Sequence, residues 1–309
     1  MHRNNVVARG ASDVLRKLDR FGASKKKRTA TGSHLRIVIL GIVFLIVVPP
    51  SRFVSSNLLL GSLYSAKMHL KAPEHQVAGH IAKDGKPGPL VDDKGRFFKP
   101  LQGDSRGEIE VKFYESFSSN TEVPDHIRRY FPAYHGTQAV EGSDGAAMIV
   151  LDNLLSKYSK PSVMDVKMGS RTWYPEASEE YIQKCLRKDA RSTTVSSGFR
   201  ISGFEVSTPD SAFASSVYGG SNGVLTQLLE LKTWFENQTF YHFNSCSILI
   251  IYENESVHDD GARAQVKLVD FAHVHDGNGV IDHNFLGGLC SFINFIRDIL
   301  QSSDESTEN

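Results

Sequence analysis

Short apolar runs and helically spaced apolar residues divide the chain into predicted strands and helices. Residues 148–155 and 161–169 form compact, β-prone apolar runs, which predict buried strands. Residues 224–235 and 286–300 carry apolar side chains at helical spacing, which predicts core helices. Residues 108–117 predict a further helix, preceding the first buried strand. Within this pattern the strand at 161–169 stands apart, because it also holds two charged residues.

That strand places a carboxylate and an ammonium on one face. Side chains alternate along a strand, so Asp165 and Lys167 share a face while Val166 and Met168 point to the other. Such a pair suits phosphate chemistry, because the acid holds a hydroxyl or a metal-bound group while the lysine neutralises phosphoryl charge. A partly exposed salt bridge is the ordinary alternative for so short a pattern.

The chain lacks the common nucleotide-binding motifs. Residues 76–102 give two short strand candidates joined by a turn rich in Gly, Pro and Asp, an arrangement that suits a loop over phosphates. No GxxxxGK[ST] occurs, which excludes a Walker-type phosphate loop, and no HRDxxxxN occurs, which argues against an ordinary protein kinase. A nucleotide-dependent enzyme of this sequence must therefore use other residues.

Composition agrees with an enzyme domain that has a sizeable core. The 309 residues are 40% hydrophobic and 23% charged, with 35 basic and 35 acidic side chains. This balance gives no reason to expect direct nucleic-acid binding, although a local basic pocket for a phosphorylated small molecule is compatible with it. Cys185, Cys246 and Cys290 are far apart and show no CxxC spacing, which argues against a zinc site and a disulfide framework. A reducing compartment follows from that cysteine usage.

The first 67 residues differ from the rest of the chain. A basic cluster at 25–28 precedes an apolar run at 35–48, which is shorter than the roughly twenty residues that a comfortable membrane span needs. The run fits a signal-type segment, a weak anchor or part of a dispensable extension. We favour the extension and expect residues 1–67 to be mostly disordered, with membrane association through 35–48 as the alternative. The basic cluster is then a solvated charge run or a weak nuclear-import signal.

Four fixed positions connect the charged strand to a known family. Pro161, Asp165, Lys167 and Gly169 complete the pattern PxxxDxKxG, the signature of the inositol polyphosphate kinase family. Together with KGRFFKPLQ, SSGFRISGF and VKLVDFAHVHDGNGVIDHNFLGGL, this pattern makes residues 68–300 resemble that family, and its plant multikinases in particular.

The resemblance implies an α+β protein with the two-lobed fold shared by SAICAR synthase and protein kinases. It divides the chain into an N-terminal extension (1–67), a kinase domain (68–300) and an acidic disordered tail (301–309). The implied activity is phosphorylation of inositol 1,4,5-trisphosphate and inositol tetrakisphosphates towards the pentakisphosphate, of the 6-/3-kinase type, with ATP and Mg²⁺ as cofactors. We expect a monomer that binds inositol phosphates and acts in the nucleus and the cytoplasm.

The resemblance also assigns roles on the ATP side of the site. Lys99 would reach the ATP phosphates, whereas spacing alone would make it an ordinary surface lysine of a strand. Asp270 would bind Mg²⁺, since hard oxygen ligands suit that ion. The other implied contacts are Asp165 with the ribose or the reacting centre, the hinge residues Asp152 and Leu154 with adenine, and Ser247 with a hydroxyl on the ATP side.

On the substrate side, the resemblance implies that Lys167 binds the phosphorylated inositol and that His273 lies beside it. A helix predicted after the signature sets Lys184 and Lys188 four residues apart on one side. In the family this helix lines the inositol phosphate pocket, and a solvated helix face is the equal alternative. The implied catalytic residues are Asp165, Lys167 and Asp270.

One departure from the family follows Val206. The plant multikinases carry several dozen further residues at this point, which are missing here. Their loss shortens the C-lobe and removes cover from its apolar surface. A catalytically impaired variant that acts as a binding or scaffold protein is therefore the alternative function.

Overall fold

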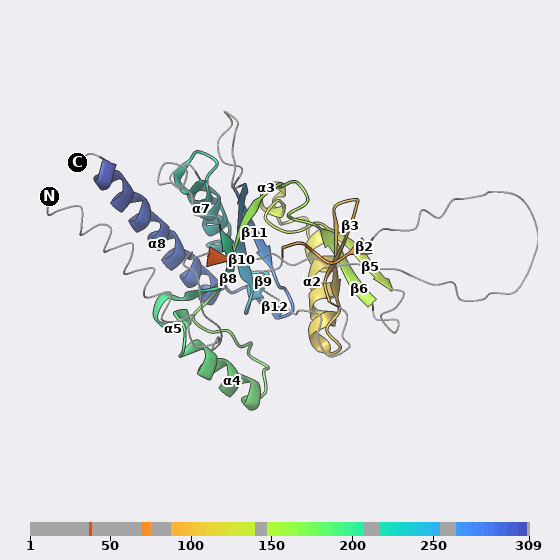
Figure 1. The fold of residues 1–309 in the computed structure, drawn as a ribbon. Coiled ribbons are helices and arrows are strands. Elements are labelled where there is room, and N and C mark those ends of the chain that lie inside the picture. Colours follow the sequence, from red (N-terminus) through yellow and green to blue (C-terminus); the bar gives the residue numbers. More distant parts are fainter. Residues whose placement is uncertain are drawn as a thin grey trace, which may run out of the picture.

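Two lobes lie side by side in the computed structural model, which describes residues 37–38, 70–75, 88–139, 147–206, 217–253 and 264–307 (Figure 1). The first lobe is built on a five-stranded antiparallel sheet of order β2-β3-β4-β6-β5. Its strands are β2 (Leu70–Lys71), β3 (Leu90–Asp92), β4 (Arg96–Pro100), β5 (Tyr134–Ala139) and β6 (Ala147–Asp152). The buried strand predicted at 148–155 is β6, which ends at Asp152, so the predicted hinge residue Leu154 lies in the turn that follows.

The second lobe contains another five-stranded antiparallel sheet, of order β1-β8-β7-β10-β11. Its strands are β1 (Ile37–Val38), β7 (Pro161–Met168), β8 (Phe199–Val206), β10 (Ser247–Glu253) and β11 (Gln265–Val269), and β9 (Tyr241–Phe243) pairs separately with β12 (Val274–Asp276). The signature strand β7 lies between β8 and β10. This central position accounts for its nearly continuous burial.

Helices cover the sheets, and some of them begin at side-chain caps. They are α2 (Ser105–Ser119), α3 (Asp125–Arg128), α4 (Glu179–Asp189), α5 (Thr194–Ser197), α7 (Val224–Phe235) and α8 (His283–Thr307). Asp104 accepts a hydrogen bond from the Arg106 backbone at the start of α2, and Ser178 accepts one from the Tyr181 backbone at the start of α4. The helices predicted at 108–117 and 224–235 are thus confirmed as α2 and α7. Figure 1 shows α7 and α8 packed together on the second lobe.

The C-terminal helix is longer than predicted. Helix α8 runs to Thr307, so the expectation of a disordered tail at 301–309 is wrong for residues 301–307. Adding a residue to an existing helix fixes one residue for one hydrogen bond, which is much less unfavourable than starting a new helix. The packed turns around Phe292, Ile293 and Ile296, all buried as predicted, provide that start. Residues 308–309 lie outside the described part of the chain.

Aromatic side chains join the two lobes into one core. Phe113 of α2 packs against Phe271 of the second lobe with ring centroids 4.3 Å apart, and edge-on against Phe243 at 5.8 Å. Phe131 also stacks on Phe271, at 5.5 Å, and its ring lies 6.1 Å from that of Phe113. Such pairs add to the free energy of area burial. Helix α2 is therefore held against the second lobe, which fixes the side chains that it carries between the lobes.

The predicted N-terminal extension lies almost entirely outside the described residues. Within the apolar run at 35–48, the structure describes residues 37–38, whose backbone pairs with the edge of β8 in the register Ile37 to Val206. None of the helices in the described ranges is long and apolar enough to cross a membrane. The predicted departure after Val206 falls on residues 207–216, which are also outside the description.

Candidate functional site

A lysine and two carboxylates meet between the lobes. Lys99 of β4 donates to Glu110 of α2 at 2.6 Å and to Asp270, directly after β11, at 3.1 Å. The Lys99 and Glu110 side chains are 12% and 3% exposed, and Glu110 also accepts from the Phe271 backbone at 3.3 Å. Three elements that are distant in sequence therefore converge on one ammonium group.

The charges of this cluster support one another. Burial would lower the pKa of Lys99, but the carboxylates of Glu110 and Asp270 outweigh it and raise the pKa above its ordinary value. Burial raises the pKa of Glu110, and Lys99 opposes that change. Lys99 is therefore a fixed positive charge at neutral pH, aimed between the lobes where a phosphate chain can approach.

Asp270 connects this cluster with the signature strand. Its Oδ2 lies 3.9 Å from the Nζ of Lys167, which also donates to the Ser245 carbonyl. Asp270 has a φ of 69°, a left-handed conformation that is unfavourable for a residue with a Cβ and is often found at functional sites. The backbone thus holds one carboxylate between two lysines, Lys99 and Lys167.

Asp165 and Ser247 lie next to this row on adjacent strands. Asp165 of β7 is 1% exposed and Ser247 of β10 is fully buried, directly opposite Lys167. No contact of good hydrogen-bond geometry reaches Asp165 Oδ1 or the Ser247 hydroxyl from the described residues, although Ser247 lies close enough to the carboxylate to lower its pKa by hydrogen bonding. The Ser247 hydroxyl therefore lies beside the Asp165 carboxylate. Burial, and then the charge of Asp270, raise the pKa of Asp165 to about 6 against the pull of Lys167.

The raised pKa predicts that Asp165 makes the free protein less stable. Its folded pKa of about 6 exceeds the ordinary aspartate pKa of 3.8, so the folded state holds more protons between these values and the free energy of unfolding falls as pH rises through them. We expect Asp165→Asn to unfold at higher urea concentration than the parent at pH ~8, by about 2–3 kcal/mol, and to lose this gain near pH ~4. Asp298→Asn, an exposed carboxylate on α8, is the control. An equal difference between parent and Asp165→Asn at both pH values would contradict the assignment.

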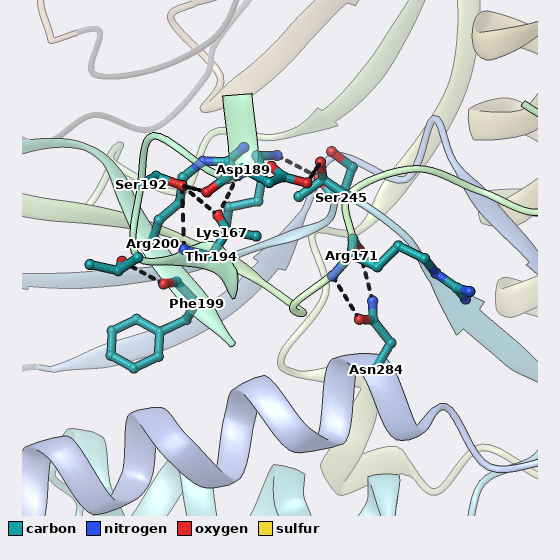
Figure 2. Close-up of polar contacts among 11 residues, drawn as sticks. Lys167, Arg171, Asp189, Ser192, Thr194, Phe199, Arg200, Ser245 and Asn284 are labelled. Carbon is teal, nitrogen blue, oxygen red and sulfur yellow. Dashed lines mark hydrogen bonds and ion pairs between the residues drawn. The ribbon is translucent and has the colours of Figure 1, made fainter. Parts of the chain in front are cut away.

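The glycine of the signature has a steric role. Gly169 has a φ of +93°, and a Cβ at this position would overlap the side chain of Asn284. Asn284 in turn accepts from the Arg171 backbone at 3.0 Å and donates to the Arg171 carbonyl at 3.0 Å. The end of β7 is thereby fixed to the start of α8, as Figure 2 shows.

A narrow, largely apolar pocket lies next to Lys99. Its apolar walls come from both lobes, and Asp152 and Leu154, the residues predicted for the hinge, are among its lining. Lys99, Glu110 and Asp270 line it as well. The apolar lining residues are Phe97, Tyr114, Pro132, Leu151, Leu249 and Val269. Both lobes therefore contribute to a pocket whose lining includes the charged cluster.

On the opposite side of Lys167, aromatic rings surround His273. The ring of Tyr174 stacks on His273 with centroids 4.9 Å apart, and the Tyr181 hydroxyl lies 3.3 Å from His273 Nε2. Burial, and then the charges of Arg106 and Lys167, lower the pKa of His273 to about 4. His273 is therefore a neutral imidazole at physiological pH, and its buried Nδ1 has no hydrogen-bond partner among the described residues.

The two helix lysines have different surroundings. Lys188 lies near the end of α4, and crowding by the protein, then the charges of Arg200 and Lys167, lower its pKa. Lys184 lies one turn earlier, and the side chains of both lysines are exposed. The positive charges of Arg200 and Lys167 act on Lys188.

Two residues near the site were not predicted. Glu110 was placed on a helix but not paired with Lys99, because the contact spans α2 and β4 and depends on how the helix packs. Arg106, held by Asp104 at 2.7 Å, is close enough to lower the pKa of His273. A surface arginine beside an N-cap carries no signal in the sequence that would separate it from an ordinary exposed residue.

A lysine held by carboxylates beside a narrow pocket, between two lobes of an α+β fold, is an arrangement suited to a phosphotransferase. The comparisons specify the class further. A family model described as inositol polyphosphate kinase matches residues 148–221 and 211–297. The chain belongs to the inositol polyphosphate kinase family, within which its relatives are multikinases, and it is a kinase.

Three relatives illustrate this membership. Inositol polyphosphate multikinase alpha of Arabidopsis thaliana is 74% identical over 286 residues, covering 78% of this chain and all of the relative. A multikinase of Oryza sativa subsp. japonica is 44% identical, covering 78% of this chain and 98% of its own. A solved structure of an inositol phosphate multikinase matches with a TM-score of 0.55 at 68% identity, covering 62% of this chain and 99% of that one.

The alignments also reveal a gap. The Arabidopsis alignment runs over 286 positions while using 78% of a 309-residue chain, so several dozen positions of the relative have no counterpart here. The two segments matched by the family model meet at 211–221, close behind Val206. Both observations agree with the predicted departure from the family.

Proposed function

We propose that this kinase transfers the γ-phosphate of ATP to inositol 1,4,5-trisphosphate and inositol tetrakisphosphates, towards the pentakisphosphate, at the 6- and 3-positions. The observation that carries the proposal is the row Lys99, Asp270, Lys167, which lies beside the narrow pocket that Lys99 and Asp270 line. Membership of the inositol polyphosphate kinase family supports the choice of substrate.

The residues suggest a division of labour. Lys99 binds the ATP phosphates, while the buried Oδ1 of Asp165 accepts hydrogen bonds from the ribose hydroxyls. Lys167 binds the substrate and neutralises charge on the transferred group, with Lys188 and His273 flanking it. Phosphoryl transfer needs little covalent help from the protein, so positioning and charge neutralisation account for the rate.

A divalent cation fits this donor set. The described residues contain no group of three or more His, Cys, Asp or Glu side chains that would cage a metal by themselves. Mg²⁺ instead uses one or two carboxylates and completes its coordination with nucleotide phosphates and water. Asp270 is the carboxylate that lies between Lys99 and Lys167, where the ATP phosphates would bind. Its charge also raises the pKa of the buried Asp165. When bound, the ion would neutralise charge on the ATP phosphates.

The direct test is phosphate transfer from labelled ATP to inositol 1,4,5-trisphosphate by the full-length chain. We expect inositol tetrakisphosphate and then pentakisphosphate, with both products requiring Mg²⁺. A thermal-shift measurement with ATP and Mg²⁺ runs in parallel, because binding raises apparent stability whether or not transfer occurs.

The gap after Val206 gives this pair of measurements a second use. A folded chain that is stabilised by ATP and Mg²⁺ but forms no product would contradict the proposed reaction. It would instead favour the binding or scaffold role, with the missing C-lobe residues as the cause. A chain that neither binds ATP nor forms product would contradict both the proposed reaction and the assignment of the pocket to ATP.

A further inference from the structure

A buried polar cluster lies beneath helix α4, outside the residues discussed so far. The carboxylate of Asp189 accepts from the Arg200 guanidinium at 3.0 Å and from the Thr172 hydroxyl at 2.7 Å. The same Arg200 nitrogen donates to the Thr194 hydroxyl at 2.7 Å. Figure 2 shows Arg200 together with Asp189 and Thr194, its two partners. We call Thr172, Asp189, Thr194 and Arg200 the Asp189 cluster.

The cluster is almost completely removed from water. Asp189 and Thr172 are each 1% exposed, Thr194 is fully buried, and Arg200 is 7% exposed. A buried ion pair contributes little net stability, because desolvation of both charges offsets their attraction, and apolar replacements are often as stable. Stability alone is therefore a weak reason for a carboxylate and a guanidinium here. A role in holding one particular arrangement is the better-supported explanation.

The arrangement that the cluster holds includes the substrate lysines. Arg200 on β8 is the cross-strand partner of Lys167 on β7. Asp189 is the last residue of α4 and directly follows Lys188. The ion pair between Arg200 and Asp189 thus ties the strand beside Lys167 to the helix end that carries Lys188.

Electrostatic repulsion explains why this connection between β8 and the end of α4 is needed. The positive charges of Arg200 and Lys167 both act on Lys188 and disfavour its charged form, while the carboxylate of Asp189 opposes them. Before an anionic ligand arrives, three cations therefore repel one another at this end of α4. A buried carboxylate joined to the arginine holds the helix in place against that repulsion.

We propose that Asp189 is a positioning residue, which with Arg200 fixes the end of helix α4 so that Lys188 and Lys167 meet the same phosphorylated ligand. The inference rests on the proposed function, because it takes an inositol phosphate as that ligand. Neither Asp189 nor Arg200 need touch the ligand itself. Their effect passes through the two lysines.

The test is the affinity of the full-length chain for inositol 1,4,5-trisphosphate, measured by titration calorimetry without ATP. Asp189→Asn keeps the size of the side chain and an acceptor for Thr172 but removes the charge. We expect its dissociation constant to rise about tenfold, because small displacements of binding groups have effects of this order or greater. Its affinity for ATP with Mg²⁺ should stay within about twofold of the parent, since the cluster lies on the substrate side.

Two further variants separate positioning from folding. Asp189→Leu combined with Arg200→Met replaces the ion pair by apolar groups, a change that often preserves stability. It should remain folded and lose inositol trisphosphate affinity as Asp189→Asn does. Ile296→Val on α8 destabilises the same lobe by loss of a buried methyl group and should leave both affinities unchanged.

Each outcome decides between the two ideas. Parent-like inositol trisphosphate affinity in a folded Asp189 variant would overturn the positioning role and leave the proposed function intact. Equal weakening of inositol trisphosphate and ATP binding, matched by Ile296→Val, would show a merely structural role. A parent chain that binds no inositol trisphosphate would overturn both proposals, whereas binding without phosphate transfer would overturn the proposed reaction alone.

Discussion

Replacing Lys167 by alanine should reduce phosphate transfer to inositol trisphosphate by about a hundredfold to a thousandfold, the usual effect of removing one preorganised charge from a transition state. Lys167 is the cation shared by the signature strand and the row at Asp270, with its Nζ 3.9 Å from that carboxylate. Without Lys167, one positive charge that would neutralise the transferred phosphoryl group is missing. The measurement is single-turnover transfer from labelled ATP at saturating concentrations of both substrates.

The variant should remain folded, because the Lys167 side chain is 14% exposed and the carboxylates near it keep another cation as neighbour. Lys99 still pairs with Asp270 at 3.1 Å in the variant. Lys232→Ala, which removes the surface pair of Lys232 with Glu236 on α7, is the matched control and should keep parental turnover. Turnover within about twofold of the parent in folded Lys167→Ala would remove this lysine from the proposed chemistry.

Replacing Asp270 by asparagine should have an effect at least as large. The change keeps the shape of the side chain but removes the charge that would hold Mg²⁺ at the ATP phosphates. We expect turnover to fall by about a thousandfold and the requirement for Mg²⁺ to shift to higher concentrations, which a titration of initial rate against Mg²⁺ measures. The same substitution takes one of two carboxylates from Lys99, so ATP affinity should fall as well.

Asp298→Asn on the exposed face of α8 serves as the charge-matched control and should behave as the parent. If Asp270→Asn lost turnover without any change in the Mg²⁺ dependence, the aspartate would act on Lys99 and not on the metal. Parental turnover in the Asp270 variant would contradict the site as a whole.

Local patterns predicted most of the elements that carry the site. The apolar run at 161–169 forms β7, and its alternation brings Asp165 and Lys167 within the influence of Asp270, as the PxxxDxKxG pattern implied. Helical spacing at 224–235 matches α7 residue for residue. These predictions succeeded because periodicity of two or of 3.6 residues is written in consecutive positions.

Contacts between distant segments could not be predicted in the same way. Nothing in the sequence near Lys99 indicates that its ammonium group donates a hydrogen bond to Glu110. That contact depends on the packing of Phe113 against Phe271. The helix at 179–189 offered Lys184 and Lys188 as equals, and the fold places Lys188 under the influence of the charges of Arg200 and Lys167.

By itself, the sequence determined the family signature, the strand that carries Asp165 and Lys167, and the identity of Asp270 as a candidate metal ligand. The tertiary structure decided which charges face one another: Glu110 with Lys99, Asp270 between two lysines, and Asp189 with Arg200 beneath α4. The reason is that spacing along the chain fixes which face of an element a side chain occupies. The partner across an interface is set by packing of side chains that are far apart in sequence.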